Sequence, residues 1–126
     1  MASPVKIFFD GGCRPEPVGM ETAVVVRGQA YVERGLGPGS GMDAEWLALI
    51  AAVRIAQSSG LEDVVFLGDA TAVIAQANGT VKCRAGFVQY FETLTALKAA
   101  SGPLRIRYVK RAQNLAGIAL ARLHGR

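Results

Sequence analysis

Residues 8–14, Phe8-Phe9-Asp10-Gly11-Gly12-Cys13-Arg14, place a carboxylate at the end of an apolar run and directly before two glycines. The alternation over residues 4–10 predicts a strand with both faces partly apolar. The glycine pair predicts a sharp turn into a loop that lasts to Gly19. A carboxylate at the end of a buried strand is costly unless something pairs with it, so Asp10 is the first candidate functional residue.

Outward from this stretch, the sequence predicts three consecutive strands followed by alternating helices and strands. A two-residue turn at Gly28-Gln29 between β-branched runs favours an antiparallel hairpin. The predicted strands are residues 4–10, 21–27, 30–36, 64–67 and 104–108, and the predicted helices are residues 44–56, with Asp43 as cap, 70–77, 87–100 and 112–123. This order predicts an α/β fold in which a five-stranded mixed sheet, an antiparallel meander followed by two parallel strands, is flanked by helices.

The composition fits one globular domain spanning residues 1–126. The chain is 51% hydrophobic and 19% charged, and it has no apolar run of the roughly 20 residues that cross a membrane. No secretory signal is visible, and Cys13 and Cys83 lack a metal-binding spacing, so we expect two reduced thiols in a cytoplasmic protein.

Charge is unevenly distributed along the chain. Residues 1–80 carry five basic against nine acidic side chains, whereas residues 81–126 carry nine basic side chains against Glu92 alone. A basic second half suits a polyanion such as nucleic acid, and the acids of the first half remain free to bind cations. A solvated basic face without a partner is the simpler alternative.

Two further acids occupy junctions like that of Asp10. Asp69 follows the short apolar strand 64–67, and Glu45 lies in the first turn of the helix between the two strands. Sites in open α/β sheets form beyond the strand ends, so the three carboxylates are expected to converge. Oxygen ligands of this kind select Mg²⁺ or Mn²⁺, and one or two such ions could hold them together. Each acid taken singly could instead be an ordinary turn or helix-end residue.

Four segments, in order along nearly the whole chain, resemble the ribonuclease H family (type 1). They are the glycine-rich opening motif at residues 10–17, the helix segment Ala44-Glu45-Trp46-Leu47-Ala48-Leu49, the segment from Gly68-Asp69-Ala70 to Asn78-Gly79, and residues 108–114 followed by Leu120-Ala121. The resemblance implies metal-dependent hydrolysis of the RNA strand of RNA–DNA hybrids, with structured or double-stranded RNA as an alternative substrate.

The resemblance also implies a role for individual residues. Asp10, Glu45 and Asp69 would be the catalytic metal ligands. The backbone of Gly11, Gly12 and Cys13 would approach RNA 2′-hydroxyl groups, which distinguish RNA from DNA. Phosphate or sugar contacts would come from Arg14, Lys110, Arg111 and Asn114.

The chain departs from the family pattern at several positions. The fourth carboxylate of the family aligns with Ile118, or with Gly117 if the alignment shifts by one residue, and neither offers a ligand. The basic handle insertion and the histidine before the last helix are missing, and His124 is expected to be an ordinary residue. Trp46 is either a core residue or a side chain that stacks on a base or sugar.

Two functional hypotheses follow. The first is a ribonuclease H with weak or Mn²⁺-preferring activity, and the second is a non-catalytic nucleic-acid-binding module with the same fold. Both predict binding that weakens steeply with salt.

Overall fold

A computed structural model describes residues 3–125 of the chain. Its five strands form one mixed sheet. The strand order is β3-β2-β1-β4-β5, with antiparallel pairing among β1, β2 and β3 and parallel pairing of β4 with β1 and β5. The strands are β1 (Val5–Cys13), β2 (Met20–Val26), β3 (Gln29–Glu33), β4 (Val64–Gly68) and β5 (Arg105–Tyr108). This confirms the predicted sheet.

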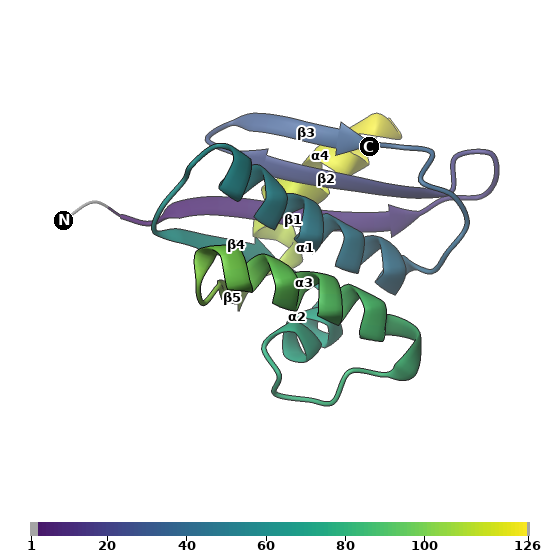
Figure 1. Ribbon diagram of the computed structural model, residues 1–126. Coiled ribbons are helices and arrows are strands. Elements are labelled where there is room, and N and C mark those ends of the chain that lie inside the picture. The colour runs from purple at the N-terminus through teal and green to yellow at the C-terminus, as the bar shows by residue number, and fades with distance from the viewer. Residues whose placement is uncertain (1–2, 126) are drawn as a thin grey trace.

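Helices cover the two faces of the sheet unequally. The α-helices of the described chain are α1 (Gly41–Ser58), α2 (Thr71–Ala77), α3 (Val88–Ser101) and α4 (Leu115–Leu123). In Figure 1, α1 and α3 lie on one face of the sheet and α4 crosses behind β1 and β2 on the other. The larger apolar core fills the space under α1 and α3, while Ala116 and Leu120 of α4 pack on Ala23 and Val25 of β2.

The first strand is longer than predicted. Gly11, Gly12 and Cys13 continue β1 and pair with Thr22, Glu21 and Met20 of β2. The prediction of a sharp turn at the glycine pair was therefore wrong. The glycines permit a close approach of another element, described below, rather than a change of direction.

The hairpin turn lies one residue earlier than predicted. Arg27 and Gly28 both have positive φ, as a two-residue hairpin turn of the I′ type requires, and Gln29 already belongs to β3. β3 ends at Glu33 rather than at Leu36 and is exposed along its length.

Helix α1 begins before the predicted start. Ser40 is its N-cap, and Asp43 is the third helical residue, where its carboxylate accepts from the Ser40 backbone N–H to complete a capping box. The assignment of Asp43 as the cap was wrong, and Glu45 consequently lies in the second turn of the helix rather than the first.

Trp46 of α1 belongs to the core. Its side chain is fully buried, its indole N–H donates to Gln76 Oε1 at 3.1 Å, and its ring stacks on Tyr90 of α3. An indole in this position cannot reach a nucleic-acid base, so the stacking alternative is excluded.

The last predicted helix is divided in two. A 3₁₀ turn occupies Arg111–Gln113, and Asn114 then caps α4 by accepting from the Ala116 N–H at 3.1 Å. Asn114 has extended backbone angles, which interrupt the helical run that its neighbours suggest. Among the described residues, no helix combines the length and apolar character needed to cross a membrane.

Candidate metal centre

Asp10 and Asp69 are brought together by the register of β1 and β4. The parallel pairing ends with Phe8 opposite Leu67. Two residues further along each strand, the chain reaches Asp10 on one side and Asp69 on the other. Asp10 is thus inside β1 rather than at its end, but it lies just beyond the end of the ladder with β4, where sites form in open sheets.

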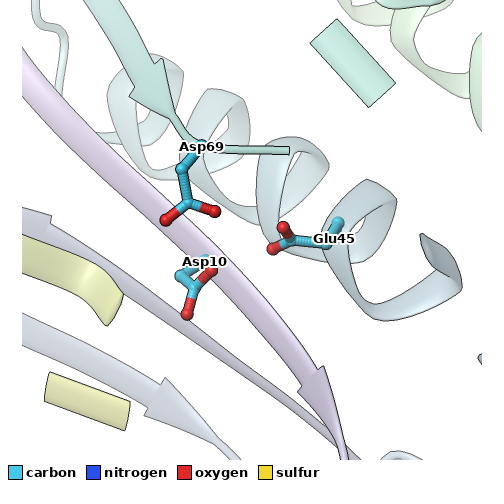
Figure 2. A group of neighbouring side chains, drawn as sticks. All are labelled: Asp10, Glu45 and Asp69. Atoms are coloured by element: carbon cyan, nitrogen blue, oxygen red, sulfur yellow. The ribbon is translucent and has the colours of Figure 1, made fainter. Parts of the chain in front are cut away.

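Glu45 reaches the same place from α1. The Gly11 backbone N–H donates to Glu45 Oε1, which ties α1 to β1 beside Asp10. A Cβ on Gly11 would lie 2.7 Å from the Glu45 nitrogen and closer still to the carbonyl of Ala44, so only glycine permits this contact. Figure 2 shows the carboxylates of Asp10, Glu45 and Asp69 pointing into a common space.

The three carboxylates form a donor set suited to a divalent ion. One oxygen from each lies within 4.8 Å of the others. Asp10 is only 5% exposed, so its charge is poorly solvated. Arg111 Nη1 stands 3.8 Å from Asp69 Oδ1, so one side-chain cation approaches the group. Hard oxygen ligands gathered this closely fit Mg²⁺ or Mn²⁺.

The same crowding raises the pKa of two members. Burial, followed by the charge of Asp69, raises the pKa of Asp10 to about 6. Burial, followed by the charge of Asp10, raises the pKa of Glu45 to about 9, although the hydrogen bond from Gly11 opposes the shift. A cation bound between these carboxyl groups would stabilise their ionised forms.

Asn114 supports the triad from behind. Its side-chain N–H₂ donates to the Phe9 carbonyl at 3.0 Å and to Asp69 Oδ2 at 3.3 Å, and its oxygen caps α4. The residue is fully buried. Its polar groups are therefore already used within the protein, and the expected nucleic-acid contact at Asn114 does not fit this position.

The other predicted nucleic-acid residues, Lys110 excepted, line the pocket that contains Asp10. Gly11, Gly12 and Cys13 are the last residues of β1, Lys110 and Arg111 are exposed, and Arg14 lines the pocket that contains Asp10. The N–H of Gly11 is occupied by Glu45. Strand residues two apart direct their N–H groups to the same side, so the Cys13 N–H points toward the same open edge.

Gly117 and Ile118, the positions that the resemblance aligns with a fourth carboxylate, carry none. A Cβ on Gly117 would lie 3.5 Å from Asp10 Oδ2, and the neighbouring Ile118 is 38% exposed on α4. Gly117 therefore backs onto Asp10, and Ile118 stands on the surface beside it.

Sequence reasoning missed a second polar cluster, in which Glu21 is paired with His124. Glu21 is 1% exposed in a strand that is buried along its whole length, and an acid next to the apolar run 23–26 was the local signal for it. His124 Nε2 lies 2.7 Å from Glu21 Oε1, a contact that was not predicted for this residue.

Comparison with known proteins places the chain in a family. The model of the family described as reverse transcriptase-like matches residues 20–124. A search of curated protein sequences gave no significant match.

Solved structures with the same architecture include several ribonucleases H. RNase H1 of the archaeon Halobacterium salinarum is 25% identical, with 94% of each chain covered and a TM-score of 0.80. The N-terminal RNase H domain of Rv2228c from Mycobacterium tuberculosis is 23% identical, with 98% of this chain and 100% of that chain covered and a TM-score of 0.78. LC11-RNase H1, isolated from compost and solved with an RNA/DNA hybrid, is 22% identical, with 92% of each chain covered and a TM-score of 0.79.

The chain has the strand order of an RNase H-like fold, and its acidic triad lies where the sheet opens. The family model covers most of the chain's length. The chain therefore belongs to the reverse transcriptase-like family, and its fold is that of the type 1 ribonucleases H.

Proposed function

We propose that this protein is a metal-dependent endonuclease that hydrolyses the RNA strand of RNA–DNA hybrids. The observation that carries the proposal is the convergence of Asp10, Glu45 and Asp69, with one oxygen of each within 4.8 Å of the others. Support also comes from the structural similarity to LC11-RNase H1, which was solved with a hybrid.

The triad would hold one or two Mg²⁺ or Mn²⁺ ions. When bound, such ions can activate a water molecule and stabilise the leaving oxygen of a phosphodiester. The chain's own contribution is to fix the ligands: the Gly11 N–H orients Glu45, and Asn114 orients Asp69. Both contacts come from rigid elements, which suits a site that must hold charged groups against their mutual repulsion.

Substrate binding would use the surface around the triad. The backbone at Gly12 and Cys13 would approach the RNA 2′-hydroxyl groups, and Gly11 would contribute by letting α1 come close. Arg14, Lys110 and Arg111 would bind phosphates, while Asn114 supports the ligands instead. We further propose that residues 1–126 act as one domain in the cytoplasm, where its free thiols Cys13 and Cys83 would stay reduced.

The test is cleavage of an end-labelled RNA–DNA hybrid with Mg²⁺ or Mn²⁺, beside single-stranded RNA, double-stranded RNA and double-stranded DNA. We expect hybrid cleavage in the parent and none in Asp10→Asn. Asp63→Asn is the matched control, because Asp63 is an exposed acid at the opposite end of β4 and its positive φ suits asparagine. Cleavage of double-stranded RNA alone would replace the hybrid as substrate, and no cleavage with either metal would refute the enzyme.

The second candidate is a non-catalytic module that binds nucleic acid. The observation in its favour is that neither Gly117 nor Ile118 can supply a fourth carboxylate beside Asp10. This module would bind the hybrid specifically and would not cleave it in the presence of either Mg²⁺ or Mn²⁺. Binding without cleavage therefore separates the two functions.

A further inference from the structure

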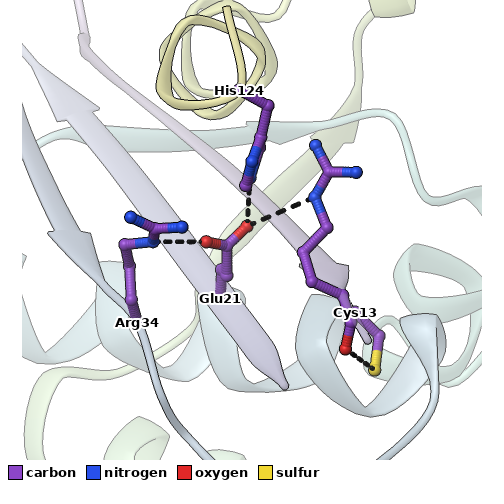
Figure 3. A network of polar contacts seen from close by, with 5 residues as sticks. Cys13, Glu21, Arg34 and His124 are labelled. Atoms are coloured by element: carbon purple, nitrogen blue, oxygen red, sulfur yellow. Dashed lines mark hydrogen bonds and ion pairs between the residues drawn. The ribbon is translucent and has the colours of Figure 1, made fainter. Parts of the chain in front are cut away.

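A buried cluster of charged side chains lies beyond the metal triad on the α4 face of the sheet. Glu21 of β2 is its centre (Figure 3). Arg34 Nε donates to Glu21 Oε2 at 2.6 Å, His124 Nε2 lies 2.7 Å from Oε1, and Arg14 Nε stands 3.9 Å from the same oxygen. These partners follow β3, α4 and β1 respectively, so segments far apart in the sequence meet at one carboxylate.

Both carboxylate oxygens of Glu21 have a close partner other than Arg14, namely Arg34 at Oε2 and His124 at Oε1. Burial alone would raise the pKa of Glu21, but hydrogen bonds from His124 and Arg34 outweigh it and hold the pKa below the ordinary value. One carboxylate with Arg34 and His124 already in hydrogen-bond contact does not need a third cation for its own charge. The longer Arg14 contact, at 3.9 Å, instead draws the Nε side of the Arg14 guanidinium toward Glu21.

The Arg14 side chain borders a pocket of about 220 Å³ that joins this cluster to the metal triad. Asp10 and Gly12 form one side of the pocket, Gly117 and His124 of the α4 segment form another, and Arg111 closes it near Asp69. Arg14 keeps 32% of its side chain exposed, so guanidinium N–H groups remain for a ligand. Gly117 has no side chain to fill the space beside Asp10.

We propose that this pocket is a phosphate subsite for the backbone of the bound hybrid, in which Arg14 binds the phosphate and Glu21 is the positioning residue that aims Arg14. The inference rests on the proposed function, because the phosphate belongs to the same nucleic acid that reaches the triad. Arg34 balances the charge of Glu21 and His124 occupies Oε1, which leaves the charge of Arg14 for the substrate. A planar guanidinium held through its Nε can present its two terminal nitrogens to one phosphate, a geometry that lysine lacks.

The first measurement is the affinity of the full chain for a short labelled hybrid in EDTA, which prevents metal-dependent cleavage. We expect Arg14→Ala to bind about tenfold more weakly, as loss of a charged hydrogen bond implies. The slope of log affinity against log salt should also fall by about 1. Arg54→Ala is the matched control, since Arg54 is an exposed arginine on α1 outside the pocket, and it should leave affinity and slope close to those of the parent.

The second measurement separates positioning from general support of the fold. Glu21→Gln should weaken hybrid binding in the parent but cause no further loss in the Arg14→Ala background. Because Glu21→Gln removes the charge that Arg34 balances, Glu21→Asp is the second variant: it keeps the negative charge but withdraws the carboxylate from Arg14. It should weaken hybrid binding in the parent and cause no further loss in the Arg14→Ala background, whereas parental affinity in Glu21→Asp would overturn the role of Glu21.

The third measurement locates the phosphate. Hybrids carrying one uncharged methylphosphonate at successive positions should include one position that weakens the parent about tenfold and leaves Arg14→Ala unaffected. Equal sensitivity of parent and Arg14→Ala at every position would overturn the subsite while the proposed function stands. Absence of hybrid binding by the parent would refute the proposed function and this inference together.

Discussion

Gly11 and Asp10 show how adjacent residues divide the work of the site. Asp10 supplies a carboxylate at the opening of the sheet, and Gly11 lets α1 approach so that Glu45 can be held by a backbone N–H. The glycine is required by packing between two backbones rather than by a turn.

We expect Gly11→Ala to damage the site more than the fold. The added methyl group would meet the backbone of α1 at Ala44 and Glu45, so the start of the helix would have to shift and carry Glu45 with it. Hybrid cleavage should fall at least a hundredfold, since about 1 Å of misplacement can cost this much. Gly86→Ala is the control, because a Cβ there meets nothing within 4 Å and the residue lies outside the pocket that contains Asp10. Parental activity in Gly11→Ala would contradict the proposed contact.

Asp10→Asn should have opposite effects on activity and on metal-free stability. Burial and the charge of Asp69 raise the pKa of Asp10 to about 6, so the ionised Asp10 present at pH 7 destabilises the folded chain relative to the unfolded one. The uncharged amide of Asn does not have this unfavourable charge. The melting temperature in EDTA should therefore rise at pH 7, while cleavage is lost. Calorimetry of both proteins measures the first effect, and a lower melting temperature for Asp10→Asn would show that its charge is well compensated without metal.

At the scale of single elements, α4 decides how the site is completed. It is a nine-residue helix that starts at Asn114 and places Gly117 against Asp10. A helix with an aspartate at this point would add a negative group to the triad, whereas α4 offers a gap at Gly117 and an apolar side chain at Ile118.

Ile118→Asp is expected to raise Mg²⁺-dependent cleavage of the hybrid. An added carboxylate on α4 would give a second ion another ligand, and Mg²⁺ demands more complete octahedral coordination than the triad alone provides. Cleavage rates in Mg²⁺ and Mn²⁺ measure the effect, with Ile118→Asn as the uncharged control. An unchanged rate in Mg²⁺ would mean that a side chain at Ile118 does not reach the metal.

The elements also show where sequence patterns succeed and fail. The existence and order of the strands and principal helices were predictable from alternating apolar residues and glycine or proline breaks. The length of β1 was not, because the packing of Gly11 against α1 is a tertiary contact. The contact between Glu21 and His124 joins residues 103 positions apart, and no local pattern signals it. Asp10, Glu45 and Asp69 were predictable as a group because each follows from the position of its own element.

For the whole molecule, the ionisation of the triad links stability, pH and metal. Asp10 and Glu45 have folded pKa values of about 6 and about 9, both above their ordinary values. The native state therefore retains protons that the unfolded chain has released, so the contribution to stability is lost as pH rises through these values.

In EDTA, we accordingly expect the melting temperature to fall as the pH rises from about 4 to about 9, with Asp10 contributing up to pH 6 and Glu45 up to pH 9. Saturating Mn²⁺ should remove most of the decline, because the cation replaces the protons, and its affinity should increase over the same interval. Thermal denaturation with and without Mn²⁺ checks this. Glu45→Gln should flatten the EDTA curve, and a melting temperature that rises with pH in EDTA would contradict the assignment.

The contact between Gly11 and α1 has a consequence for how the site can adapt. On the α1 side, direct contact between the backbones of β1 and α1 sets the spacing of Asp10 and Glu45. This spacing cannot widen to fit a larger ion without moving α1. On the α4 side, the missing side chain at Gly117 leaves free volume beside Asp10. The site is thus tightly packed on the α1 side and has free volume on the α4 side. Any adjustment to the radius of the ion or to the conformation of the backbone therefore has to take place on the α4 side.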